Sequence, residues 1–131
     1  MNFSIVRLLL AAALFSLVTA CAVRQSPAQL APLTLAAAPA LERLEQQADI
    51  ELDTGYFRTL KSGSVWKHVG SVNEGEVYRP VRDVFTLEGS QMHEAYLVVA
   101  GNTLTGFYLP VEHSFSPLKH KISLTFSKQE Q

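Results

Sequence analysis

The chain has 131 residues and almost balanced charge, with Lys+Arg 11, Asp+Glu 12 and a formal net charge of −1 at pH 7. It has no basic stripe, so nucleic acid is not expected as a partner. Its one cysteine, Cys21, leaves no intrachain disulfide to stabilise a fold. The domain must therefore be held together by a packed core or by a partner.

The N-terminus contains the three parts of a secretory signal. Arg7 lies in a short, positively charged start, residues 8–18 form an apolar run, and Thr19-Ala20 supplies the small residues that precede a cleavage site. The uncharged stretch between Arg7 and Arg24 is too short for a comfortable membrane-spanning helix, which needs about 20 apolar residues. We expect a signal peptide that ends at Ala20.

The sequence Val18-Thr19-Ala20-Cys21 resembles the lipobox of bacterial lipoproteins. The resemblance implies that Cys21 receives a diacylglyceryl group, that a dedicated peptidase cuts between Ala20 and Cys21, and that the new amino group is acylated. Two or three acyl chains anchor a protein firmly, and no other cofactor is expected. The residue after the cysteine is Ala22 and not the aspartate associated with inner-membrane retention. The resemblance therefore implies anchorage to the outer membrane, and it does not distinguish the periplasmic from the outer side.

The alternative is an ordinary signal peptide, cut near Ala20, that leaves Cys21 as a free thiol. An odd thiol in an exported protein would then need another explanation.

Residues 21–40 are rich in alanine and proline and carry one charge, Arg24. Proline favours extended backbone, so we expect a flexible tether between the lipid and a domain spanning residues 41–131; a partly helical segment between the prolines is the alternative. At residues 41–48, Leu41, Leu44 and Ala48 fall on one helical face among good helix formers. This pattern predicts a short helix at the start of the domain.

From about Ile50 onward, short runs of Val, Ile, Thr, Phe and Tyr alternate with turn-forming residues. The regular spacing predicts a mainly β fold, a small antiparallel sandwich or barrel-like domain. The expected strands are 54–60, 64–69, 75–79, 83–88, 92–100, 103–109 and 120–126, with a loop around Pro110–Pro117.

The Gly101-Asn102 pair predicts a hairpin with a two-residue turn. This turn would pair Ala100 with Thr103 and place Tyr96 opposite Phe107. Both faces of the hairpin are apolar, which predicts a central position with cover on each side. The predicted helix could cover one face and a partner the other.

Gly106 lies within the second strand of this hairpin. A glycine in a strand interior is typical of a bend or of a close approach by another backbone.

His93, Glu112 and His113 are the candidates for a metal site. They would meet only if the following loop folds back over the end of the hairpin, and they lack a recognised ligand spacing. The simpler interpretation places these histidines at the surface. No serine lies in a nucleophile elbow, and Cys21 is used by the lipid, so we assign no catalytic residue and expect no enzyme.

Trp66, Tyr78 and Arg79 are candidates for a binding face, because Trp, Tyr and Arg often contribute most of the binding energy in interfaces. The alternative is that Trp66 and Tyr78 fill the core. We therefore expect a lipid-anchored, non-catalytic envelope protein that docks on a protein partner in the cell envelope. A binder of a small ligand or a metal ion is the alternative, and an envelope hydrolase comes third.

Overall fold

The computed structural model describes residues 22–34 and 39–130. The signal segment and Cys21 lie outside these residues. Within them the chain is mainly β and pairs its strands antiparallel, as expected, but it contains no helix. The same residues therefore include no helix that could cross a membrane. The strands are β1 (Ser26–Pro27), β2 (Ala31–Pro32), β3 (Leu41–Leu44), β4 (Ala48–Glu51), β5 (Phe57–Leu60), β6 (Val65–Val72), β7 (Gly75–Pro80), β8 (Thr86–Glu88), β9 (Met92–Glu94), β10 (Tyr96–Ala100), β11 (Thr103–Leu109), β12 (Ser114–Ser123) and β13 (Phe126–Lys128).

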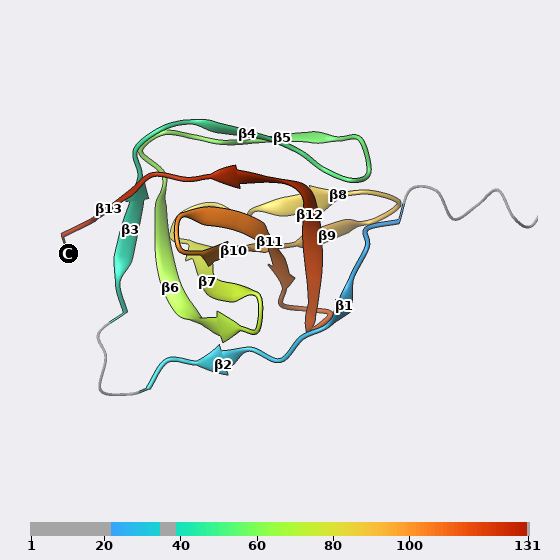
Figure 1. Cartoon of the computed structure of the whole chain (residues 1–131), viewed down its shortest axis with the longest axis horizontal. Helices are drawn as coiled ribbons and strands as arrows, with labels where there is room; N and C mark the ends of the chain where they lie inside the picture. Colours follow the sequence, from blue (N-terminus) through green and yellow to red (C-terminus); the bar gives the residue numbers. More distant parts are fainter. Residues whose placement is uncertain (1–21, 35–38, 131) are drawn as a thin grey trace, which may run out of the picture.

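The largest element is a nine-stranded sheet. Eight of its strands follow the order β1-β12-β11-β10-β7-β6-β3-β13, and the ninth, β2, pairs with β6 beside this path. Only Leu124 and Thr125 separate β12 from β13 along the chain, yet these strands lie near opposite ends of this order. The sheet therefore curves back on itself (Figure 1). Two separate ribbons, β4 with β5 and β8 with β9, complete the fold.

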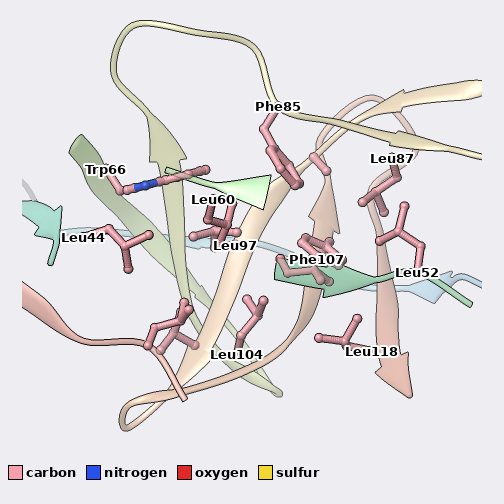
Figure 2. Close-up of a cluster of buried hydrophobic side chains, with 14 of the residues drawn as sticks. Leu44, Leu52, Leu60, Trp66, Phe85, Leu87, Leu97, Leu104, Phe107 and Leu118 are labelled. Carbon is pink, nitrogen blue, oxygen red and sulfur yellow. The ribbon is translucent and has the colours of Figure 1, made fainter. Parts of the chain in front are cut away.

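The main core is a cluster of leucine, valine and aromatic side chains enclosed by this sheet (Figure 2). The sheet contributes Leu44, Leu97 and Leu104, each fully buried, and the two ribbons add Leu60 and Leu87. Burial of one such side chain stabilises the folded state by about 1.5–3 kcal/mol. Neither ribbon belongs to the hydrogen-bonded path of the sheet, and the apolar side chains of both pack into its core.

Residues 41–48 do not form the expected helix. Leu41–Leu44 is strand β3, which pairs with β6 on one side and β13 on the other, and Ala48 begins β4. Leu44 is fully buried, and its backbone N–H donates to the Ser64 carbonyl at 2.9 Å. A helix of this length is marginal on its own. Pairing on both edges and burial of Leu44 therefore outweigh the local helical preference.

The β10–β11 hairpin occupies the centre of the sheet, as predicted, but its register shifts near the turn. Ala100 pairs with Thr103 as expected, whereas Tyr96 pairs with Tyr108 in place of Phe107 because a β-bulge intervenes. A shift of one residue reverses which face each later side chain occupies. Phe107 consequently joins the main core, and Tyr108 belongs to a second apolar cluster.

The second apolar cluster consists of Val72, Val77, Val98, Tyr108 and Phe115. Ala28 and Leu30 pack against it. These two residues belong to a segment, residues 22–34, that we call the N-terminal strap. The second face of the hairpin is thus covered by the chain itself, and the expectation that a partner covers it is wrong.

The N-terminal strap is paired to the domain at two places, Ser26–Pro27 and Ala31–Pro32. β1 pairs with β12, β2 pairs with β6, and the Ala28 N–H donates to the His113 carbonyl at 3.0 Å. Proline is tolerated at such edge positions because it need not donate to the ladder. The prediction of a flexible tether is therefore wrong for residues 22–34, where contacts to two strands fix the chain. Residues 35–38 lie outside the described residues.

Candidate binding site: a cationic cleft

A cleft of about 420 Å³ opens beside the β5–β6 turn and the segment that follows β7. This volume falls at the lower end of the range for small-molecule sites. Its walls are formed by residues of β5, β6 and the loop after β7, with one residue of β3 and one after β13. The lining residues are Arg43, Arg58, Thr59, Leu60, Lys61, Gly63, Ser64, Val65, Trp66, Pro80, Arg82, Asp83, Val84, Phe85 and Gln129.

Aromatic rings from the main core line the inner wall of this cleft. Trp66 is 3% exposed and meets Phe85 edge to face, with ring centroids 6.0 Å apart. Its indole N–H donates to the Ser64 hydroxyl at 3.0 Å, and that hydroxyl donates to the Lys61 carbonyl at 2.6 Å. Figure 2 shows Trp66 and Phe85 on the same side of the core, away from Leu104. Trp66 is thus a core residue whose position also shapes the cleft.

Four of the lining side chains are cationic, Arg43, Arg58, Lys61 and Arg82, against one carboxylate, Asp83. This imbalance is local, because the whole chain has Lys+Arg 11 and Asp+Glu 12. Among the described residues, neither Lys61 nor Arg82 has a carboxylate within salt-bridge distance, whereas Arg43 lies 3.9 Å from a Glu45 oxygen. The cleft therefore offers positive charge that the protein itself does not neutralise.

Arg58 is the most constrained of these cations. Its guanidinium lies 5.0 Å from the centre of the Phe85 ring, in cation–π geometry, and 3.6 Å from a Glu88 oxygen. Its Nε is buried and has no hydrogen-bond partner. Buried polar groups are normally paired, because an unmade hydrogen bond costs about 1–3 kcal/mol.

Chemically, the cleft combines guanidinium and ammonium donors with aromatic and aliphatic walls. Guanidinium groups bind carboxylate or phosphate through charge-assisted hydrogen bonds, which are about twice as strong as neutral ones. The arrangement suits a ligand that has an anionic group next to an apolar or aromatic part.

Tyr78 and Arg79, the other two candidates from the sequence, lie outside the cleft lining. Tyr78 is half-buried and stacks between His68 and Phe126, at ring distances of 5.1 and 5.8 Å. Burial, and then the nearby carboxylates Glu42 and Glu76, raise the pKa of Tyr78, so its hydroxyl is neutral at ordinary pH. Arg79 is exposed and pairs through its backbone with Lys67.

The three candidate metal ligands are brought only partly together. His93 is 9% exposed, and its Nδ1 lies 2.6 Å from a Glu112 oxygen. The loop does fold back to the hairpin end, but His113 Nδ1 lies 3.4 Å from the Tyr108 hydroxyl. Among the described residues, no group of three or more metal-ligating side chains is formed.

Comparison with known proteins gives no match to a protein-family model, to a curated protein or to a solved structure. The fold and the cleft thus define this chain only as a mainly β domain with a cationic site.

Proposed function

We propose that this chain is a lipid-anchored protein of the bacterial cell envelope, whose cationic cleft binds an anionic segment of a partner protein without catalysis. The observation that supports it best is the local excess of cations around an aromatic wall. The lipobox-like sequence before Cys21 supports export and acylation, and Ala22 after it supports the outer membrane as the destination.

An acidic protein segment is a suitable occupant for two reasons. A carboxylate between Lys61 and Arg82 would meet charges that have no internal partner, and hydrogen bonds to charged groups contribute about 1.5–3 kcal/mol each. An apolar residue next to that carboxylate could contact Trp66 and Phe85. Recognition would then depend on a few side chains, as in other interfaces where aromatic and arginine residues dominate the binding energy.

Photo-cross-linking in intact cells tests this function. A photoreactive amino acid at Val84, which is 68% exposed and lines the cleft, is expected to yield one dominant adduct with an envelope protein. The same amino acid at Arg79, exposed but outside the cleft lining, is the matched control and is expected to yield much less. Mass spectrometry of the adduct should identify an acidic segment of the partner.

The charge requirement is tested in the same cells. Replacing Lys61 and Arg82 together by glutamine, in the chain that carries the cross-linker at Val84, should reduce the adduct about tenfold or more, since each lost contact to a charged group costs at least about 1.5 kcal/mol. Equal adducts at Val84 and Arg79, or an adduct unchanged by loss of both cations, would contradict a function based on the cleft.

A small anionic ligand is the second candidate, because the cleft volume of about 420 Å³ lies within the range of small-molecule sites. Native mass spectrometry of detergent-extracted protein would then show a bound mass that the Lys61→Gln, Arg82→Gln variant loses.

A further inference from the structure

The described chain begins at one particular end of the domain. Val23 packs against the main core, and Val23 and Arg24 share a small cavity with Asp53 and Thr54 of the β4–β5 turn. Gln25 accepts a hydrogen bond of 2.6 Å from the Ser114 hydroxyl at the start of β12. The first described residues are therefore fixed beside the β4–β5 turn and strand β12.

Two turns lie at this end. The Thr54 hydroxyl donates to the Glu88 carbonyl at 2.7 Å, which joins the β4–β5 turn to the ribbon of β8 and β9. The β11–β12 turn lies further along the strap, where the Ala28 N–H donates to the His113 carbonyl. Figure 1 shows the first described residues beside the turn between β8 and β9, on the side where the β4–β5 turn also lies.

Both turns carry exposed apolar side chains. Phe57 is 71% exposed and Tyr56 49% beside the β4–β5 turn, and Met92 is 68% exposed after the β8–β9 turn. We call these three side chains the turn surface. Exposed apolar residues scattered singly need no explanation. Here, three of the six large exposed ones among the described residues lie at the end where the described residues begin.

The charges at this end are mixed. Arg24 and Lys119 are exposed, but so are Glu51, which pairs with Phe57, and Asp53, whose carboxylate accepts a hydrogen bond from the backbone N–H of Lys119. Contact with lipid would therefore depend on the apolar side chains.

We propose that the turn surface rests on the lipid bilayer in which the acyl chains of Cys21 are embedded. This inference depends on the lipid anchor proposed above. Two peptide units span at most about 7 Å, so a lipid on Cys21 would begin close to Val23. The N-terminal strap is paired to the sheet from Ser26, and Val23 packs against the main core, so the described residues leave little free chain next to Cys21. Tyrosine and other amphipathic or apolar side chains at such a position enter the headgroup region, to a depth of about 5–10 Å.

The test uses the full chain, extracted from membranes with its lipid and reconstituted in vesicles of phosphatidylethanolamine and phosphatidylglycerol with brominated acyl chains. Two variants, Phe57→Trp and Val84→Trp, place an indole at positions of matched exposure, 71% and 68%, the second one at the cleft. Bromine quenches indole emission only at short range. The emission of Phe57→Trp, after subtraction of the buried Trp66 of the parent chain, should be quenched at least about twofold more than that of Val84→Trp, because insertion reaches the acyl boundary.

The outcomes separate the two proposals. Equal quenching of both variants, in protein whose mass shows the lipid, would overturn the membrane-resting surface and leave the anchor intact. Protein that lacks the lipid and fails to co-sediment with vesicles would overturn both. Near-ultraviolet circular dichroism like that of the parent chain would show that both variants are folded, and both positions are exposed enough to tolerate the larger ring.

Discussion

The Phe107→Ala variant is expected to lose about 3–5 kcal/mol of unfolding free energy, the usual cost of truncating a buried phenylalanine to alanine. Phe107 is 1% exposed in the central strand β11, and its ring stacks on Phe85 at 5.7 Å. Small domains are typically stable by only about 5–15 kcal/mol, so this single change would remove a large part of the total. Because Phe85 lies under Arg58, the cleft should loosen as well.

Urea denaturation followed by circular dichroism measures this loss. The matched control is Phe57→Ala, the same chemical change at a residue that is 71% exposed, with an expected effect within about 0.5 kcal/mol. Equal stability losses in the two variants would show that Phe107 is not packed in the core as described.

The Gly106→Ala variant is expected to lose about 3 kcal/mol or more, or to fail to fold, although it adds only one methyl group. A Cβ at Gly106 would collide with the Ser116 carbonyl and lie 2.7 Å from the Phe115 ring. The Ser116 carbonyl belongs to the backbone of β12 and cannot move without disturbing the pairing of β11 with β12. Overpacking against backbone leaves fewer ways to relax than overpacking against a flexible side chain.

Gly101→Ala is the control that separates this collision from backbone conformation. Gly101 has a positive φ of 62° and nothing within 4 Å of the added carbon. A left-handed alanine costs roughly 1–2 kcal/mol, so Gly101→Ala should be clearly milder in the same denaturation assay. A Gly106→Ala variant at least as stable as Gly101→Ala would show that the close approach of β11 and β12 is absent.

The sequence predicted the mainly β antiparallel fold and the central hairpin because alternation and turn chemistry act locally. It predicted a helix at residues 41–48 because helical propensity is also local, whereas the two edges of β3 are satisfied by β6 and β13 from distant parts of the chain. Pro117 suggested a loop, yet it lies in β12 opposite Gly106, beside a register shift. The alternation of apolar and polar residues along a strand does not predict where such a register shift occurs.

The close approach at Gly106 was predictable, because only glycine fits a strand that another backbone approaches. The cleft was not. Its cations Arg43, Arg58, Lys61 and Arg82 are spread over 40 residues of sequence without a motif, and only the packing of β3, β5 and the loop after β7 brings them together. Trp66 was noticed for its residue type, but its role depends on the ring of Phe85, which the sequence did not single out.

The two proposed surfaces are neighbours on strand β5. Phe57 belongs to the turn surface, and the next three residues, Arg58 to Leu60, line the cleft. If the turn surface rests on lipid, a partner in the cleft would therefore bind close to the membrane.

The intact mass of the protein extracted from membranes tests whether Cys21 carries the proposed lipid anchor. We predict a chain that begins at Cys21 and carries the added mass of a diacylglyceryl group and an N-acyl chain, and a Cys21→Ser variant that remains an unprocessed precursor without lipid. A mature chain with a free Cys21 thiol, or a Cys21→Ser variant with unchanged processing and membrane fractionation, would show that the protein has no lipid anchor at Cys21.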